Sequence, residues 1–297
     1  MAIIYNIKDY FEAETVKEAT GLLAENPNLT IIAGGTDVLI KMHGRIIEEA
    51  DILSIRKIKS LEGIKMLQDG TISIGALGTF SGIAADAVIC NNIPILAEAA
   101  TSMGGPQIRN IATIGGNICN GVTSGDSAST LFALNALLKL QSSQDERLVP
   151  IQEFYLGPGK VALKPGEMLT EILISPENYT GFSGHYIKYS MRNAMDIATL
   201  GVAVVCKLKG KNVFEDVRIG LGVAGPTPIR CQEAEDFAKG KVISLETIAE
   251  IGKTAVKAAK ARTSWRASKE YREHLVEELT QRALKVAIAK AGGGEIA

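Results

Sequence analysis

The sequence predicts an α+β fold organised as two domains. Its 297 residues are more than one ordinary compact core needs and suit two domains. Helical and strand patterns are mixed along the chain, without the strict alternation that predicts a parallel α/β sheet. Residues 175–184, SPENYTGFSG, combine turn-forming residues and are the best candidate for a linker between the domains.

The first third of the chain contains two helical patterns and several short strand patterns. Thr15 and Glu18 form a capping box at the start of a helix that runs to Ala24. Thr36-Asp37 can cap a second helix directly after a glycine pair. Strand patterns cover residues 29–33, 52–55 and 71–74.

The middle of the chain is richer in helix. Pro94 suits the first turn of a helix that runs to about Ala100. Residues 101–117 are rich in glycine and show no helical period. Ser127–Leu140 is apolar on most sides, which predicts a buried helix.

The part after the linker separates strands from helices. Three strand patterns come first, and two long helical patterns follow them. The strands are expected at residues 185–191, 199–208 and 213–224, and the helices near 244–260 and 267–290.

Composition excludes several classes of function. Lys and Arg number 32 against 33 Asp and Glu, so the net charge of -1 favours neither nucleic acid nor an anionic membrane as a partner. The four cysteines are too far apart for metal-binding or redox pairs, which indicates a reduced, cytoplasmic chain. The three histidines have no patterned partner either, so we expect no metal site. We find no signal-peptide pattern, and no apolar stretch approaches the roughly 18 residues that span a bilayer.

Two glycine pairs recur in similar surroundings. The first lies in residues 31–37, IIAGGTD, and the second in residues 107–117, QIRNIATIGGN. Glycines let several backbone N–H groups approach the oxygens of a diphosphate, and a following helix start adds a favourable dipole. Neither motif has the lysine of a nucleoside-triphosphate loop. Each pair could alternatively be a simple tight turn, but two such motifs together favour a phosphate-bearing cofactor.

A third glycine motif matches a known cofactor-binding pattern but lacks the structural context that the pattern requires. Residues 220–225, GLGVAG, match the dinucleotide-binding pattern G-x-G-x-x-G letter for letter. The chain continues Pro226-Thr227-Pro228, which is typical of an extended segment rather than of the helix that this fold requires. We therefore expect no Rossmann fold here.

The two accepted motifs resemble those of the FAD-binding subunits of molybdenum hydroxylases, which have the vanillyl-alcohol oxidase (PCMH) type of flavin fold. In that family a sequence like AGGTD forms the first pyrophosphate loop, and one like QIRN-x-AT-x-GGN forms the second. The resemblance extends over nearly the whole chain, including residues 157–160, 224–230 and 265–272, and is strongest to the bacterial xanthine dehydrogenase subunit. It implies an FAD-binding domain over residues 1–178, subdivided near residue 60. A smaller α+β C-terminal domain, an antiparallel sheet with helices, would occupy residues 185–292.

The resemblance also implies cofactor-binding residues. Asp126, in Ser124-Gly125-Asp126-Ser127, matches a family aspartate that contacts the cofactor. Lys188 matches a lysine that reaches the flavin, where its charge would stabilise the reduced form. The complete set is Ile31, Ile32, Ala33, Gly34, Gly35, Thr36, Asp37, Ala112, Thr113, Ile114, Gly115, Gly116, Asn117, Asp126, Leu169 and Lys188.

Some of these residues have simpler interpretations. Asp126 could cap the helix that follows it, and Lys188 could be a solvated strand lysine. Asp196 would form a structural salt bridge with Arg192 or Arg109. Cys119 lies beside a flavin motif, but we expect a buried small residue rather than a covalent flavin link.

The chain departs from the family at two points. The family often has a proline near the Ser-Asp pair and a second arginine where Asn193 stands. These differences weaken the resemblance there without affecting the glycine motifs. Some relatives carry an inserted cysteine loop for an extra iron–sulfur cluster, which the cysteine spacing excludes here.

We therefore expect a subunit that binds FAD non-covalently and relays electrons from 2Fe-2S clusters to NAD. The molybdopterin centre would lie on a large partner subunit and the 2Fe-2S clusters on a small one, as in xanthine or hypoxanthine dehydrogenase. The same role in a carbon monoxide, aldehyde or nicotinate dehydrogenase is the nearest alternative. A non-catalytic nucleotide-binding module and a stand-alone flavin oxidase are alternatives of other classes.

Overall fold

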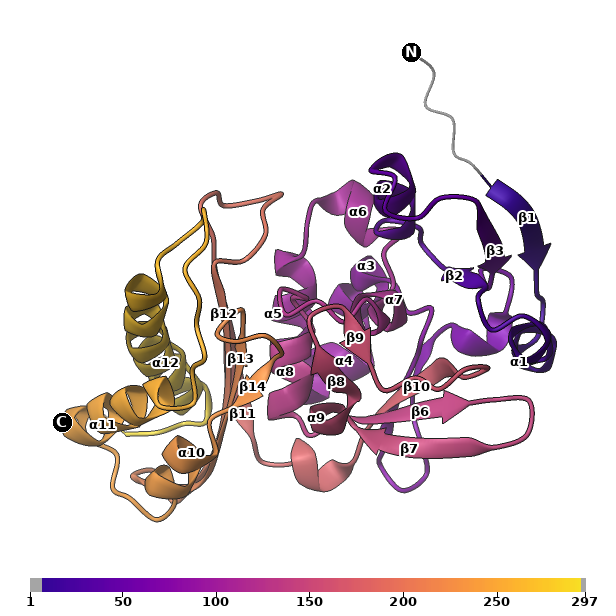
Figure 1. Cartoon of the computed structure of the whole chain (residues 1–297). Coiled ribbons are helices and arrows are strands. Elements are labelled where there is room, and N and C mark those ends of the chain that lie inside the picture. Colours follow the sequence, from indigo (N-terminus) through magenta and orange to yellow (C-terminus); the bar gives the residue numbers. More distant parts are fainter. Residues whose placement is uncertain (1–6, 295–297) are drawn as a thin grey trace.

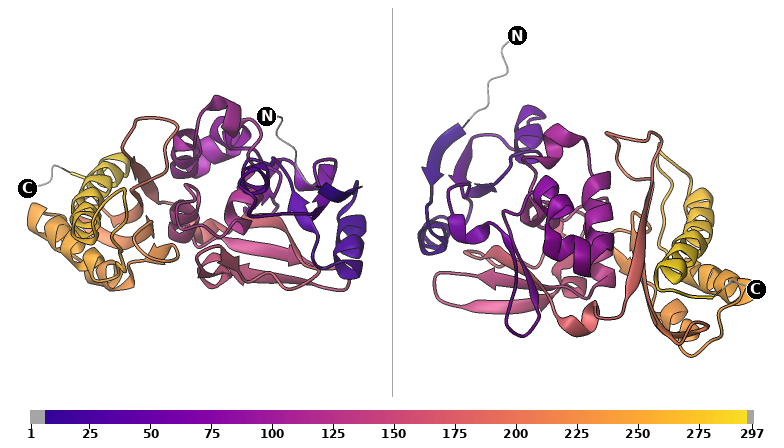
Figure 2. Two further views of the ribbon diagram at one scale, coloured as in Figure 1. Left: turned by 45° about the horizontal axis from the view of Figure 1, so that its top comes forward. Right: turned by 180° about the vertical axis from the view of Figure 1, so that it is seen from behind.

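The structure, a computed structural model, describes residues 7–294. Figure 1 shows three parts in a row: a small N-terminal sheet, a central part of helices and strands, and a C-terminal sheet covered by helices. The two further views in Figure 2 show the same three parts. Helices and mainly antiparallel sheets occur together, which confirms the predicted α+β fold class.

The N-terminal part is a three-stranded parallel sheet in the order β1-β3-β2. Its first helix begins at the predicted capping box, where Thr15 Oγ1 accepts a hydrogen bond from the Glu18 N–H at 3.1 Å. The second helix begins after Asp37, but the predicted cap is wrong because Asp37 makes no side-chain hydrogen bond to the helix. The elements are β1 (Ile7–Glu12), α1 (Val16–Glu25), β2 (Thr30–Ile32), α2 (Val38–His43) and β3 (Ala50–Ser54).

The central part packs short helices against a five-stranded antiparallel sheet in the order β4-β5-β10-β6-β7. Most of its apolar side chains form one core. Its helices are α3 (Phe80–Ala85), α4 (Ala87–Asn92), α5 (Pro94–Ser102), α6 (Pro106–Arg109), α7 (Ile114–Cys119), α8 (Ala128–Ala133) and α9 (Ile151–Phe154), with 3-10 turns at Lys59–Leu61 and Pro176–Asn178. Its strands are β4 (Ile64–Met66), β5 (Ile72–Gly75), β6 (Leu137–Gln141), β7 (Glu146–Pro150), β8 (Tyr155–Gly157), β9 (Lys160–Val161) and β10 (Met168–Ile174).

The predicted helix over Ser127–Leu140 is wrong in its second half. Helix α8 ends at Ala133, and the chain turns at Asn135, whose φ is 47°. Strand β6 follows, with alternate side chains buried. A continuous apolar run fits a buried helix and a buried strand equally well, so the pattern could not locate the change. Residues 101–117 likewise contain α6 and the start of α7, which are too short to show a helical period.

The C-terminal part is an antiparallel sheet in the order β11-β12-β13-β14. Val202 and Val204 of β12 pack under α11 and α12, while Ala203 and Val205 join the core of the central part. Both faces of the sheet are therefore covered, as Figure 1 shows, which explains the unbroken apolar run in β12. The strands are β11 (Ser183–Tyr189), β12 (Leu200–Lys209), β13 (Val213–Gly222) and β14 (Ile229–Arg230); the helices are α10 (Gln232–Ala238), which was not predicted, α11 (Leu245–Val256) and α12 (Lys269–Lys290).

The rejected glycine motif has a packing role. Its first glycines end strand β13, and the chain continues through a bend to β14 rather than into a helix. A Cβ atom on Gly220 would lie 2.0 Å from the Ser129 carbonyl oxygen. Glycine is therefore needed here because α8 packs directly on the strand.

Candidate functional site

The first glycine loop, residues 33–37, connects β2 to α2. Gly35 has a φ of +77°, a conformation that favours glycine. The N–H groups of residues 34–37 donate no hydrogen bond to any acceptor within residues 7–294. Thr36 is half-buried beside them, and Asp37 is exposed. Adjacent N–H groups without a protein acceptor are suited to the oxygens of a diphosphate, so this loop fits the cofactor that the sequence predicts.

The two glycine loops lie against each other. A Cβ atom on Gly34 would lie 1.8 Å from the carbonyl oxygen of Ile111 and 2.6 Å from its carbonyl carbon. Real atoms never approach so closely, so a side chain at this position would force the two backbones apart. Gly34 thus serves the contact between loops, while Gly35 provides the unusual backbone conformation.

The second glycine loop, residues 111–117, differs from the first because, among the described residues, all of its backbone N–H groups except that of Thr113 are already bonded. Thr113 caps α7, its Oγ1 accepting from the Gly116 N–H at 3.2 Å. The N–H groups of Ile114 and Gly115 donate to the carbonyls of Gly78 and Ala76 at 2.9 and 3.0 Å. The backbone N–H groups that the sequence suggests for cofactor binding therefore hold this loop against the central part instead.

Side chains of the second loop remain in position to bind a ligand. Asn117 Oδ1 accepts a hydrogen bond from Ser127 Oγ at 2.8 Å, which orients the amide so that its Nδ2 points away from that contact. Ala112 and Ile114 are buried in the core of the central part. Leu169, on β10, lies in the same core and is only 4% exposed.

Asp126 and Lys188 form a buried ion pair between the central and C-terminal parts. Lys188 Nζ lies 2.8 Å from Asp126 Oδ2, and the side chains are 9% and 8% exposed. Lys188 also donates to the Ser102 carbonyl at 3.2 Å. Burial raises the pKa of Asp126, and the charge of Lys188 opposes that rise. The interpretation of Lys188 as a solvated lysine is wrong, and Asp126 bonds to Lys188 rather than to the following helix.

Tyr186 completes this buried cluster and was not predicted. Its hydroxyl donates to Asp126 Oδ1 at 3.4 Å, and its side chain is buried. The signal was present, because Tyr186 and Lys188 are two residues apart on β11 and so point to the same face. Asp126 and Tyr186 line a small hollow at the junction, together with Thr123, Ser124, Gly125, Ser129, Ala198, Gly201, Gly222 and Val223.

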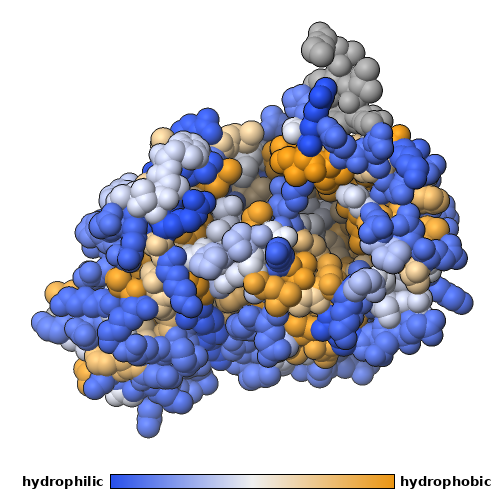
Figure 3. Space-filling model, in the orientation of Figure 1, coloured by the Kyte–Doolittle hydropathy of each residue, from blue (hydrophilic) through white to orange (hydrophobic). Residues whose placement is uncertain are grey.

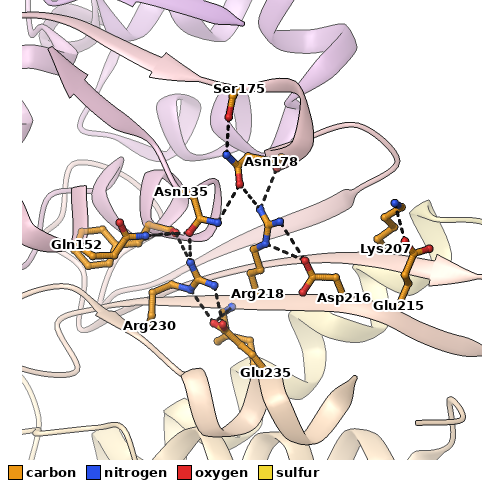
Figure 4. Close-up of polar contacts among 12 residues, drawn as sticks. Asn135, Gln152, Ser175, Asn178, Lys207, Glu215, Asp216, Arg218, Arg230 and Glu235 are labelled. Carbon is orange, nitrogen blue, oxygen red and sulfur yellow. Dashed lines mark hydrogen bonds and ion pairs between the residues drawn. The ribbon is translucent and has the colours of Figure 1, made fainter. Parts of the chain in front are cut away.

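A polar network fixes the C-terminal sheet to the central part. Figure 4 shows Arg230 and Arg218 extending from β14 and β13 toward Asn135 and Asn178. Arg230 also donates to Glu235 Oε2 at 2.6 Å. The bonds from the two arginines to the two asparagines hold the two parts in one arrangement, which is needed if Asp126 and Lys188 are to meet.

A second contact between the same parts centres on Glu98 of α5. Its Oε2 accepts from the Tyr186 N–H and lies 2.9 Å from His185 Nδ1, and its Oε1 accepts from Lys290. Burial would raise the pKa of Glu98, but these hydrogen bonds outweigh it and lower the pKa to about 2. The carboxylate therefore stays ionised while it bridges α5, β11 and α12.

The remaining predictions concern single residues. Burial raises the pKa of the Cys119 thiol to about 12, which disfavours the reactive thiolate. Asp196 pairs with Arg192 at 3.6 Å, whereas Arg109 binds the Met103 carbonyl. Within the described part of the chain no group of His, Cys, Asp and Glu could hold a metal ion. No helix between residues 7 and 294 is both long and apolar enough to cross a membrane.

Comparison with known proteins identifies the class to which this geometry belongs. Residues 5–176 match the FAD binding domain in molybdopterin dehydrogenase, and residues 185–287 match the CO dehydrogenase flavoprotein C-terminal domain. The chain is 42% identical over 290 residues to the putative xanthine dehydrogenase FAD-binding subunit of Escherichia coli (strain K12), covering 98% of this chain and 99% of that protein. It is 32% identical to the nicotinate dehydrogenase FAD-subunit of Eubacterium barkeri, covering 81% and 82% of the two chains.

The fold agrees with solved structures of the same class. A chain of carbon monoxide dehydrogenase from Hydrogenophaga pseudoflava superposes with a TM-score of 0.91 at 28% identity, covering 96% of this chain and 99% of that one. Fold and sequence together define an FAD-binding oxidoreductase subunit. The chain belongs to the FAD-binding medium subunits of the molybdenum hydroxylase family.

Proposed function

We propose that this chain is the FAD-binding subunit of a xanthine or hypoxanthine dehydrogenase. The 42% identity over 290 residues to the Escherichia coli relative, against 32% to the nicotinate dehydrogenase subunit, supports this assignment over the other substrates in the family. Its partners would be a large molybdopterin-binding subunit and a small 2Fe-2S subunit. Bound FAD would supply two-electron chemistry, accepting electrons that arrive singly and passing a hydride to NAD.

The unbonded N–H groups of residues 34–37 are the observation that carries the cofactor site. They would donate to the diphosphate, with Thr36 beside them. Thr113 and Asn117 of the second loop would contribute their side chains. Ile31, Ile32, Ala33, Ala112, Ile114, Gly115, Gly116 and Leu169 would shape the walls of the site.

Lys188 and Asp126 would act as a pair rather than separately. Because they form an ion pair at 2.8 Å, the charge that Lys188 presents to a flavin is partly balanced by Asp126. The pair would orient the cofactor between the central and C-terminal parts.

We further propose the domain limits 1–178 and 185–292, which the separate core beneath α11 and α12 supports. The four cysteines are free, which supports a location in the reducing environment of the cytoplasm.

An absorption spectrum of the purified chain from about 300 to 600 nm, repeated on the supernatant after acid precipitation, tests the cofactor. Flavin bands that move into the supernatant and prove to be FAD are expected for a non-covalent site. Gly35→Ala should weaken FAD binding, with Gly63→Ala as the matched control. Gly63 also has a positive φ, +86°, but a Cβ there would meet nothing within 4 Å. Equal FAD affinity in the two variants would contradict the assignment of the first loop.

The substrate and the electron acceptor can be tested on the assembled complex. Copurified subunits should reduce NAD with xanthine or hypoxanthine, and not with carbon monoxide, an aldehyde or nicotinate. Activity with one of those substrates instead would assign the chain to another member of the family. Flavin reduction by a small organic substrate in the isolated chain would indicate a stand-alone oxidase.

A further inference from the structure

Val223, in the third glycine motif, has a backbone conformation that valine rarely adopts. Its φ is +65°, in the left-handed region, where the backbone crowds a β-branched side chain. Gly222 and Gly225, which flank this position, do not have a positive φ in the described chain. The motif therefore has valine at the position whose conformation suits glycine best.

Contacts on both sides of Val223 hold it in this conformation. Its N–H donates to the Thr123 carbonyl at 3.1 Å, and its own carbonyl accepts from Arg272 Nη1 at 3.3 Å. Thr123 Oγ1 donates in turn to the Gly225 carbonyl at 3.0 Å, so the turn at residues 222–225 is bonded to Thr123 at two points. A strained residue persists only where its surroundings fix it, and such residues are concentrated at functional sites.

Arg272, at the start of α12, fixes this turn with a buried charge. It is only 4% exposed, and in the described chain it pairs with no carboxylate. Its guanidinium also donates to the Thr199 carbonyl at 2.7 Å and to Ser264 Oγ at 2.8 Å. Charged donors form stronger hydrogen bonds than neutral ones, and the planar guanidinium reaches several acceptors at once. Arg272 therefore holds the turn and the residue before β12 in one arrangement.

The turn borders the same small hollow as Asp126. Most residues that line this hollow are polar or are glycines, and Val223 has the largest aliphatic side chain among them. The surface over α2 is different, because Figure 3 shows hydrophobic residues gathered there and Ile40 is 70% exposed. An apolar group of a ligand at the junction would therefore have Val223 as its main aliphatic contact.

We propose that Val223 is a contact residue for the cofactor at this junction and that Arg272 is the residue that positions it. The inference rests on the proposed function, because it takes the Asp126–Lys188 pair to orient FAD beside this hollow. Asp126 offers the ligand a charged group, and Val223 offers an apolar surface next to it. Glycine at position 223 would remove the backbone strain but also this surface, which explains why the chain keeps a strained valine.

The first test compares FAD affinity with stability in Val223→Gly, using flavin fluorescence and urea denaturation of the full chain. The urea midpoint should not fall, because relief of the strained φ offsets the loss of a half-buried side chain. The Kd for FAD should nevertheless rise roughly three- to tenfold, as expected for losing one apolar side-chain contact. Glu49→Gly is the matched control, since Glu49 is exposed and has a φ of +49°. It relieves the same kind of strain and should leave the Kd unchanged.

The second test examines whether Arg272 acts through Val223. Arg272→Met removes the bond to the Val223 carbonyl and should raise the Kd for FAD, and Arg272→Lys, which keeps a donor, should recover part of the affinity. Combining Arg272→Met with Val223→Gly should raise the Kd no further than the more severe single substitution. Arg282→Met, on the exposed side of the same helix, should leave the Kd unchanged.

The outcomes that contradict the inference are distinct from failure of the proposed function. Wild-type FAD affinity in Val223→Gly, or a Kd that rises only together with a fall in the urea midpoint, would make Val223 a structural residue and overturn the inference. Effects of Arg272→Met and Val223→Gly that add in the double variant would overturn the positioning role of Arg272. If the wild type itself fails to bind FAD, the proposed function fails as well.

Discussion

The two glycine loops are similar in sequence but opposite in their hydrogen bonding. The N–H groups of residues 34–37 have no acceptor in the described chain, while those of Ile114, Gly115 and Gly116 are bonded to Gly78, Ala76 and Thr113, respectively. One Gly-Gly pair thus leaves its backbone donors without a protein acceptor, and the other uses most of its backbone donors to pack on a neighbouring segment. The same Gly-Gly sequence therefore has different backbone hydrogen bonding in the two loops.

The second loop also connects to the junction with the C-terminal part. Asn117 bonds to Ser127, the residue after Asp126, and Asp126 pairs with Lys188 on β11. A change at the junction should therefore reach the second loop through this short segment. Substitutions in each loop and at the junction can test this difference between the loops.

Gly34→Ala should have the largest effect, because its Cβ would overlap a backbone carbonyl at 1.8 Å and separate the loops. We expect a loss of roughly 3 kcal/mol or more in the free energy of unfolding and loss of FAD binding. Urea denaturation and flavin fluorescence measure the two effects. Gly116→Ala, in the second loop, is the matched control for the free energy of unfolding, since its Cβ would meet only the Thr113 hydroxyl at 3.0 Å. Similar effects of the two substitutions would contradict the proposed difference in packing.

Lys188→Met should lower the free energy of unfolding by about 3 to 5 kcal/mol, because it leaves the Asp126 carboxylate buried without its partner. Lys207→Met breaks an exposed pair with Glu215 on the same sheet, 2.7 Å long, and should change stability by less than about 1 kcal/mol. Adding Asp126→Asn to Lys188→Met should restore part of the loss. Chemical denaturation of all three variants measures the free energy of unfolding. Equal losses for Lys188→Met and Lys207→Met would exclude burial of the ion pair as the cause of a larger effect.

Thr113→Val should lower stability by about 1 kcal/mol, the usual loss for a helix cap. FAD affinity should fall too, since most backbone donors of the second loop are already bonded and this hydroxyl is one of the side-chain groups that the loop can offer a ligand. Thr79→Val removes an equivalent cap, which accepts from the Gly82 N–H at 3.1 Å, and should affect stability alone. Calorimetry and FAD titration distinguish the two variants. Unchanged FAD affinity in Thr113→Val would restrict the second loop to a structural role.

Mild acid should have the smallest effect and should leave both loops unchanged, because their hydrogen bonds involve no ionised group. The Glu98 contact is different. Its folded pKa of about 2 lies below the usual value of 4.5, so its stabilisation is present above pH 4.5 and is lost as the pH falls toward 2. Glu98 is partly exposed, so we expect a loss of about 1 kcal/mol. Denaturation midpoints measured between pH 6 and pH 3 should fall less in Glu98→Gln than in the wild type; parallel curves would rule out this contact as the cause.

Prediction from sequence succeeded where local chemistry is decisive. The Thr15 cap, the strands near residues 185–191, 199–208 and 213–224, and the absence of a helix after Gly220–Gly222 all follow from neighbouring residues, and the structure confirms them. It was wrong for Ser127–Leu140, where a helix becomes a strand within one apolar run. Both conformations bury that run equally well, and only the pairing of β6 with β7 and β10 decides between them.

The sequence by itself determined the α+β class, the two glycine motifs and the family to which they belong, because these depend on residue types and short spacings. Only the tertiary structure decided which glycine loop keeps its donors available, that Asp126 pairs with Lys188, and that Arg230 bonds to Asn135. Each of these depends on groups brought together from distant positions, as far as 95 residues apart for Arg230 and Asn135. Hydrogen bonds and ion pairs act over a few ångströms in space, so separation along the chain carries no information about them.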